Sequence, residues 1–282
     1  VEIHGRIYQT LASERPAGAQ DFAALAFHAE RAGKFQAAAQ NWELASDEYA
    51  ALGMRDKALV SLSAALRLPE GRKSRAAEAA LLAKSAALKE ALGDLAGALE
   101  DAKRAASLAK SAKSEPEDIA SHMLLLGRIY ERMGDGTAAL QTFRRGLFLL
   151  HDKKQSREKA ALTASVAWVL CARGRFIEAV NAAADAVKNL PDGKESSELA
   201  SIYSVMASAY SGLGDAEQSN AFFDRAIEIY RRKGRTRDIA SSLNQAAAAA
   251  AARADYGLAL QLLRESAELA ASSSDVLSLI HI

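Results

Sequence analysis

The sequence has no long apolar run, only one cysteine and almost no net charge. No uninterrupted apolar segment approaches the roughly 20 residues that a helix needs to cross a bilayer, so we expect no membrane contact. A single cysteine, Cys171, excludes an internal disulfide framework and fits a reducing compartment, so we expect a cytoplasmic protein. Lys and Arg number 36 against 35 Asp and Glu, a formal net charge of +1. That balance argues against a nucleic-acid-binding surface, and the short basic runs suit solvated helix ends.

Signatures of catalysis are also absent. The sequence contains none of the patterns G-x-x-x-x-G-K-[ST], G-x-G-x-x-G or H-E-x-x-H, which hold phosphates, dinucleotides and zinc. No His–Asp arrangement accompanies Cys171, so we interpret it as a small apolar residue rather than a nucleophile. Scattering over different predicted helices argues against a metal centre built from the histidines His4, His28, His122, His151 and His281. We therefore expect this chain to contain no catalytic residue, metal or cofactor, and not to be an enzyme.

What the sequence has in abundance is alanine, within an apolar fraction of 50%. Aromatic residues make up only 6%, which favours closely packed helices over a sheet. Apolar periodicity and glycine or proline punctuation predict helices and no strand, and Asp21 is expected to cap the second helix. The predicted helices span residues 1–12, 22–32, 35–52, 55–68, 73–92, 95–111, 117–133, 136–151, 157–173, 176–189, 196–213, 216–232, 236–253 and 256–272.

Small turn residues separate these helices at a constant spacing. The turns lie 41, 40, 40 and 40 residues apart in the order Gly93, Gly134, Gly174, Gly214 and Ala254. Gly33 and Gly53 are only 20 residues apart, which is half of that period. The helix over residues 35–52 is therefore expected to belong to two pairs, as the second helix of one and the first helix of the next.

Two further positions in each unit are always small. Five residues after the turns lie Ala38, Ala58, Ala98, Ala139, Ala179, Ser219 and Ala259, and twelve residues after them lie Ala45, Ala65, Ala105, Gly146, Ala186, Ala226 and Ser266. Small facing side chains let two antiparallel helices approach within about 8–10 Å. Because one such pair cannot bury its second face alone, the pairs must stack. We predict an all-α fold, a right-handed superhelix of stacked antiparallel helix pairs with a repeat of about 40 residues.

The unit around Gly134 carries the clearest pattern, with Leu126-Gly127, Tyr130, Gly134-Asp135, Ala139-Leu140, Phe143 and Gly146-Leu147. On these residues the chain resembles the tetratricopeptide repeat family, over roughly residues 21–272. The resemblance implies a scaffold that binds a protein or peptide in a concave groove lined by the first helix of each pair. The spacing exceeds the usual 34 residues and is similar to that of the C-terminal arrays of bacterial signalling ATPases.

A second resemblance concerns the N-terminal part, through His4-Gly5-Arg6-Ile7, Phe27 to Gly33 and Trp42-Glu43-Leu44-Ala45. These residues are similar to the junction between an ATPase module and its repeats in class III adenylate/guanylate cyclases and in ATP-dependent transcription activators. The resemblance implies that residues 1–13 are the tail of a preceding module and that residues 21–272 form the array. Residues 277–282 match the translation of a transposon end used for sequencing libraries, so we expect a non-native scar after Val276 and a fragment of a larger protein.

Counting from the turns predicts which side chains line the groove. The partner-binding residues expected there are Arg128, Glu131, Arg132, Trp168, Ser204, Ser208 and Asn244. Arg128 would offer a guanidinium to a carboxylate, and Trp168 either contacts the partner or packs against a neighbouring helix. The serines either hydrogen-bond an extended peptide or are small because the superhelix curves tightly. Both alternatives remain open.

The sequence thus favours a non-enzymatic interaction module that binds a peptide, a partner protein or another domain of its own parent chain. The alternative is a regulatory part of a nucleotide cyclase or of an ATP-dependent transcription activator. The flanking domains of the parent protein would distinguish these hypotheses.

Overall fold

The computed structural model describes residues 1–14, 18–68, 74–191 and 196–272, and these ranges contain fourteen α-helices and no strand. The chain divides into two compact units, Val1–Thr142 and Phe143–Ile282, each of which is described by itself. Residues 277–282, the predicted scar, lie outside the described residues. The all-α fold of stacked helix pairs is confirmed.

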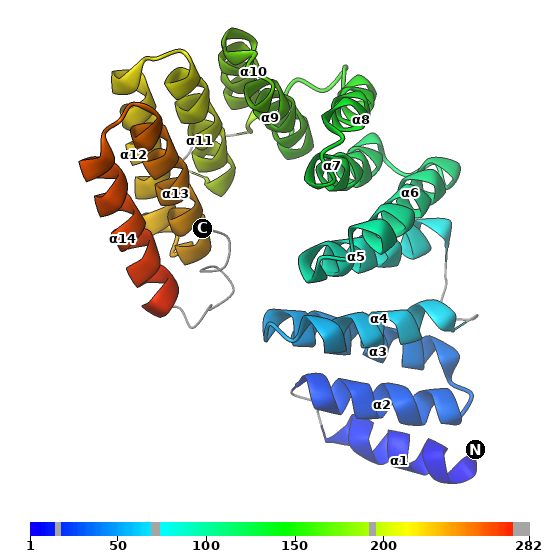
Figure 1. The fold of residues 1–282 in the computed structure, drawn as a ribbon. Helices are drawn as coiled ribbons and strands as arrows, with labels where there is room; N and C mark the ends of the chain where they lie inside the picture. The colour runs from blue at the N-terminus through cyan, green and yellow to red at the C-terminus, as the bar shows by residue number, and fades with distance from the viewer. Residues whose placement is uncertain (15–17, 69–73, 192–195, 273–282) are drawn as a thin grey trace. The chain divides into compact units, whose positions relative to one another are not determined.

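The first unit is built from helices that follow one another as antiparallel neighbours (Figure 1). Helix α3 packs against both α2 and α4, as the half-period spacing of Gly33 and Gly53 predicts, and α5 pairs with α6. Helix α8 contains the boundary between the two units. The helices are α1 (Glu2–Ser13), α2 (Ala19–Arg31), α3 (Phe35–Ala51), α4 (Arg55–Arg67), α5 (Arg75–Leu92), α6 (Leu95–Ser111), α7 (Pro116–Arg132) and α8 (Gly136–Leu149).

The second unit contains three consecutive helix pairs. Within each pair the two helices are joined by a tight turn, and α10 packs on α11 and α12 on α13 to connect one pair to the next. The helices are α9 (Arg157–Ala172), α10 (Phe176–Asn189), α11 (Ser197–Gly212), α12 (Ala216–Arg232), α13 (Thr236–Ala252) and α14 (Tyr256–Ser272). All predicted helices are present, with ends that differ by at most three residues from the predicted ones.

The predicted cap of the second helix is wrong. Helix α2 begins at Ala19 with Gly18 as its N-cap, and Asp21 lies inside the first turn. Ala19 is only 4% exposed, so its packing extends the helix by residues that the sequence pattern assigned to the preceding loop. Asp21 still complements the positive end of the helix dipole there.

The turns share a left-handed residue that ends the first helix of each pair. At Gly134 φ is +81°, and the following amide of Asp135 donates to the carbonyl of Tyr130 at 2.9 Å, which closes the helix end. Gly93, Gly174 and Gly214 adopt the same conformation. Ala254 adopts it too, with φ of +61°, although a side chain disfavours that region. The last unit therefore keeps the turn geometry without the glycine.

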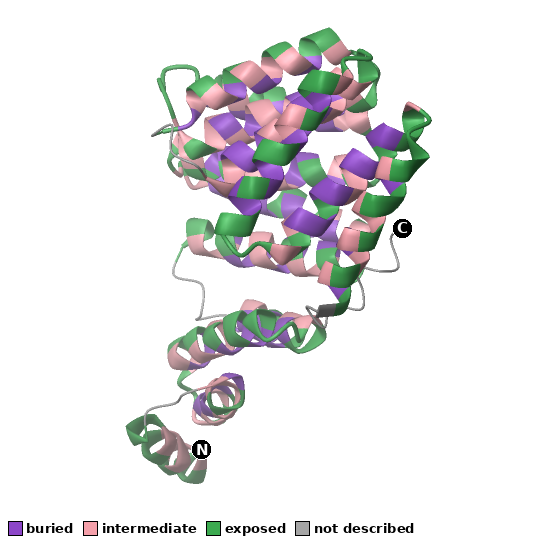
Figure 2. Ribbon diagram, turned by 90° about the vertical axis from the view of Figure 1, so that its left-hand side faces the viewer, coloured by how far each residue is buried: buried purple, intermediate pink, exposed green. Residues whose placement is uncertain are grey.

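The small positions that recur after the turns lie inside the helix stack. All fourteen are buried, and Ala139 and Ala179 are fully so, while Ala259 is 6% exposed. Around them the larger side chains Leu62, Phe143 and Phe223 are also buried. Buried residues follow the inward sides of the helices, and exposed residues follow their outer sides (Figure 2). Close helix approach through small residues and filling by a few large ones together make the core.

Ser219 is a buried serine at one of these small positions, and its replacement should stabilise the protein. Its side chain is fully buried, and its Oγ has no hydrogen-bond partner among the described residues. A buried hydroxyl without a partner costs about 1–3 kcal/mol of desolvation. We therefore expect Ser219→Ala to raise the free energy of unfolding by about 1 kcal/mol, measured by urea denaturation. Ser266→Ala is the matched control, because the Oγ of Ser266 donates to the carbonyl of Ala240 at 3.3 Å; equal gains in both variants would contradict the explanation.

Candidate functional site

The first helices of the pairs lie next to one another within each unit. In the second unit α11 packs against both α9 and α13, and in the first unit α5 contacts α7. Residues separated by nearly one repeat therefore come side by side on adjacent first helices, as Ser204 and Ser242 do. We call these surfaces the first-helix face of the first unit (α3, α5 and α7) and of the second unit (α9, α11 and α13).

A buried carboxylate anchors two arginines on the first-helix face of the first unit. The Glu90 side chain on α5 is 6% exposed. On α7, Arg132 Nη1 lies 3.2 Å from Glu90 Oε1 and donates to its backbone carbonyl at 2.9 Å, while Arg128 Nη2 lies 3.6 Å from Oε2. Both arginines remain about half exposed, at 53% and 46%. One carboxylate thus holds two guanidiniums, whose outer donors face solvent.

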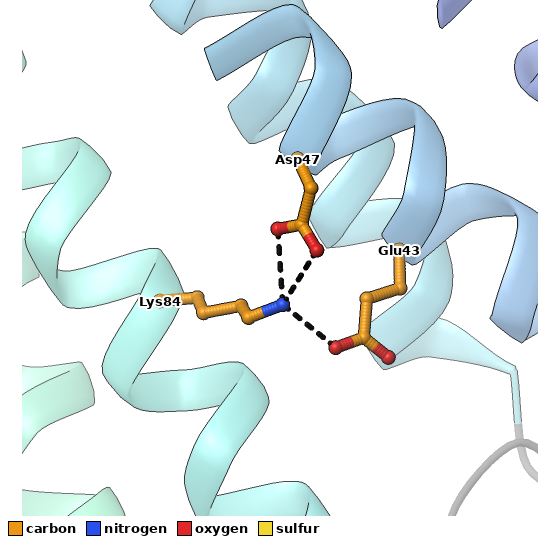
Figure 3. Close-up of polar contacts among 3 residues, drawn as sticks. All are labelled: Glu43, Asp47 and Lys84. Atoms are coloured by element: carbon orange, nitrogen blue, oxygen red, sulfur yellow. Dashed lines mark hydrogen bonds and ion pairs between the residues drawn. The ribbon is translucent and has the colours of Figure 1, made fainter. Parts of the chain in front are cut away.

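A second ion-pair cluster joins α3 to α5 on the same face (Figure 3). Lys84 Nζ donates to Glu43 Oε1 at 2.8 Å and to both carboxylate oxygens of Asp47 at 2.9 Å. Burial alone would lower the pKa of Lys84, but the hydrogen bonds to Glu43 and Asp47 outweigh it and raise that pKa. The cluster therefore keeps its lysine charged and ties one pair to the next.

A third charged group lies inside the pair formed by α5 and α6. Asp101 is 6% exposed, and its Oδ2 accepts a hydrogen bond from Ser85 Oγ at 2.6 Å and an ion pair from Lys89 Nζ at 2.7 Å. Glu90 and Asp101 are both buried acids. Each is stabilised in the interior because basic or hydroxyl donors reach it from a neighbouring helix.

Trp168 lies on α9 in the second unit and is only partly buried. Its ring packs against a core cluster that includes Ile202, Val205 and Met206 of α11. Packing against the neighbouring helix, one of the two alternatives for this residue, is therefore present. Trp168 thus stays partly exposed on a first helix of the second unit.

Neutral polar side chains connect α11 and α13 on that face. Ser204 Oγ lies 3.2 Å from Ser242 Oγ, and Ser208 Oγ donates to Gln245 Oε1 at 3.4 Å. Ser204 is 6% exposed, so its hydroxyl serves the contact between the two helices and is not a surface group. Asn244 is partly buried, and its Oδ1 has no hydrogen-bond partner among the described residues.

The predicted groove residues thus fall into two groups. Three of them, Arg128, Glu131 and Arg132, lie on α7 in the first unit. The other four lie on first helices of the second unit: Trp168 on α9, Ser204 and Ser208 on α11, and Asn244 on α13. Sequence reasoning missed Glu90, which fixes the arginines, and Gln245, which bonds to Ser208. The sequence signal that could have identified them is their position in the repeat. Glu90 occupies the same position before its turn as Glu131 does, and Gln245 directly follows Asn244.

The histidines and the cysteine are placed differently from one another. His4 and His28, on different helices, meet with their Nδ1 atoms 2.9 Å apart, which the scattered sequence positions did not predict. Across residues 1–14, 18–68, 74–191 and 196–272, no group of three or more His, Cys, Asp or Glu side chains is placed to hold a metal ion.

Burial raises the pKa of Cys171, which disfavours its thiolate. No helix in the described part of the chain is long and apolar enough to span a bilayer.

Comparison with known proteins gives one family match and many matches of fold. A family model described as "Tetratricopeptide repeat" matches residues 198–272, which cover α11 to α14. No curated protein matches the chain.

Solved structures share the fold over most of the chain. BtubC from P. vanneervenii is 18% identical, with a TM-score of 0.57 over 86% of this chain and 92% of that one. The Rap conjugation gene regulator of plasmid pLS20, solved with the Phr* peptide, is 11% identical, with a TM-score of 0.66 over 88% and 78%. A Rap protein complexed with competence and sporulation factor is 14% identical, with a TM-score of 0.65 over 96% and 79%. Identities this low establish the fold alone.

The family match and the shared fold agree with the repeat that the sequence predicts. The matched residues contain the turns at Gly214 and Ala254, and the solved structures extend the same stacked-pair fold over the other helices. The resemblance to tetratricopeptide repeats is confirmed. Residues 198–272 match the tetratricopeptide repeat family, and the chain shares its stacked-pair fold with solved structures over most of its length.

Proposed function

We propose that this chain is a protein-interaction module and that the first-helix face of its second unit binds an extended peptide segment of a partner. Tetratricopeptide repeats of this kind support an interaction scaffold. Two of the similar solved structures, the pLS20 Rap regulator and the Rap protein with competence and sporulation factor, hold a peptide or protein factor. The fold of this chain supports a similar mode of binding.

The unsatisfied amide of Asn244 carries this proposal. Its Oδ1 has no hydrogen-bond partner among the residues that the structure describes, and leaving such an atom unpaired costs about 1–3 kcal/mol. Turning the amide toward a backbone N–H of a bound peptide would supply the partner. Ser208 on α11 lies near Asn244, because Ser208 donates a hydrogen bond to Gln245, the residue that directly follows Asn244.

The chemistry of the face suits an extended backbone. Asn244, Gln245 and Ser208 are neutral groups that both donate and accept, so they can pair with peptide N–H and C=O groups without a charge on the partner. Trp168 occupies the same repeat position as Ser208, 40 residues earlier, and its partly accessible ring offers an apolar anchor. A large ring beside neutral hydrogen-bonding groups favours a segment with one apolar side chain.

Peptide display on the purified chain, followed by affinity measurements, tests the proposal. For a selected peptide we expect Trp168→Ala and Asn244→Ala each to weaken binding about tenfold or more, which is about 1.4 kcal/mol. Leu260→Ala is the control, because Leu260 is 55% exposed on α14, outside the first-helix face. The proposal fails if no peptide is selected, or if the two face variants bind as tightly as the control.

Arg128, Glu131 and Arg132 remain a proposed contact surface of a different kind. The half-exposed guanidiniums of Arg128 and Arg132 suit carboxylates of a partner, although Glu90 already uses part of their donor capacity. Arg128→Ala therefore has to be judged together with its effect on stability.

A regulatory role inside a larger signalling protein also stays a proposal. It rests on the resemblance of residues 4–45 to the junction between an ATPase module and its repeats. Reading the flanking DNA tests it: cyclase or P-loop motifs beside the array would support it, and a frame that encodes only repeats would contradict it.

A further inference from the structure

Helix α1 is held on the array by few contacts, and one of them can titrate. None of the twelve residues of α1 is buried. Tyr8 packs on a core cluster that includes Ala29 and Ala38, and Lys34 Nζ lies 4.7 Å from the centre of its ring. A polar contact between α1 and α2 joins His4 Nδ1 to His28 Nδ1, at 2.9 Å.

The pair requires at least one neutral imidazole. A hydrogen bond between two Nδ1 atoms needs a proton on one and a lone pair on the other. With a single extra proton the charged ring still donates to its neutral partner, so the contact survives. With both rings protonated, two N–H groups and two positive charges face each other, and the contact becomes repulsive.

The surroundings offer little to offset that repulsion. Burial, then His28, then the amino terminus and Arg31 lower the pKa of His4, and no carboxylate is among these causes. Arg31 lies over the ring of Phe27, which itself packs edge-on against both imidazoles. Of the nearby acids, Glu30 accepts from Trp42 Nε1 at 3.4 Å, and Glu2 is exposed on α1. The exposed Arg6 adds a further positive charge to α1.

We propose that His4 and His28 form a pH-sensitive latch, which holds α1 on α2 at neutral pH and releases it when both rings are protonated. The docked state binds fewer protons than the released state, so docking is complete above the ordinary histidine pKa of about 6.5 and is lost as the pH falls below it. Release uncovers the cluster of Ala29 and Ala38 on which Tyr8 packs. The array thereby gains an apolar end face in acid.

Trp42 provides a signal for release, because it packs on the same cluster as Tyr8. In a Trp168→Phe background, its emission should change between about pH 8 and about pH 5, with a slope of about one to two protons, since the docked pair binds at most one and the released pair binds two. Amide exchange of α1 should lose protection over the same range. His4→Asn and His28→Asn should each remove the transition, because a single protonated imidazole then faces a neutral side chain, and the double variant should show none either.

His122→Asn is the control, because His122 is partly buried on α7, away from the pair. That variant should leave the transition unchanged, and circular dichroism at about pH 8 should show wild-type helix content in every variant. The latch is refuted if wild-type emission and α1 protection stay constant across the range. A transition of unchanged slope in either single variant would equally overturn it.

Discussion

Replacing both Arg128 and Arg132 by alanine should lower the free energy of unfolding by about 2–4 kcal/mol. The double change leaves the carboxylate of Glu90, only 6% exposed, without its ion-pair partners. Breaking a buried pair on one side typically costs about 3–5 kcal/mol, because an uncompensated charge stays inside. We expect a smaller loss here, since both guanidiniums are about half exposed and already partly hydrated. Urea denaturation followed by circular dichroism measures the effect.

The control for this prediction is Arg104→Ala. Arg104 is 54% exposed and lies 3.8 Å from Glu78, so its removal should change stability by less than about 1 kcal/mol. Adding Glu90→Gln to the double variant should recover part of the loss, because the buried charge is then gone. If the double variant unfolds at the wild-type urea concentration, the Glu90 network contributes nothing to stability.

Ala179→Leu should destabilise the second unit by about 1–3 kcal/mol. Ala179 on α10 is fully buried against Leu170 of α9 and Ala209 of α11. The added carbons of leucine have no free volume there, so the helices must separate or neighbouring side chains must leave their preferred rotamers. Thermal and urea denaturation of the full chain would both report the loss.

Asn181→Leu provides the matched control on the same helix. Asn181 is exposed on α10, so the added apolar side chain meets solvent and should leave stability almost unchanged. Wild-type melting of Ala179→Leu would show that the position five residues after the turn is not a close-packing position. Ala139, which is also fully buried, occupies the same position in the first unit.

The fold was predictable because its determinants are local and repeated. The regularly spaced turn glycines specify where the first helices end, and the small residues after each turn identify the sides on which paired helices face each other. The glycines and the small residues both recur in the sequence at a spacing of about 40 residues. The eroded turn at Ala254 was predictable only because the neighbouring turns set the phase. Asp21 was misassigned as a cap because the start of α2 depends on the burial of Ala19, a tertiary effect that no local pattern contains.

The candidate site was less predictable, because a helical register identifies a face but not the state of its side chains. Ser204 lies on the predicted face, yet it is buried by its contact with Ser242 of the next helix. Arg128 is on that face too, but its charge is partly used by Glu90, which comes from a different repeat. The meeting of His4 and His28 depends on how α1 docks, for which the sequence offers no periodicity.

The contacts between neighbouring first helices differ in kind between the two units, and this has a consequence for their response to ionic strength. In the first unit α3, α5 and α7 are linked by ion pairs of Lys84 and Glu90, whereas in the second α11 and α13 are linked by neutral hydrogen bonds. Salt weakens the attraction between partly exposed opposite charges and hardly affects neutral hydrogen bonds. We therefore expect added salt to weaken the contacts between first helices more in the first unit than in the second.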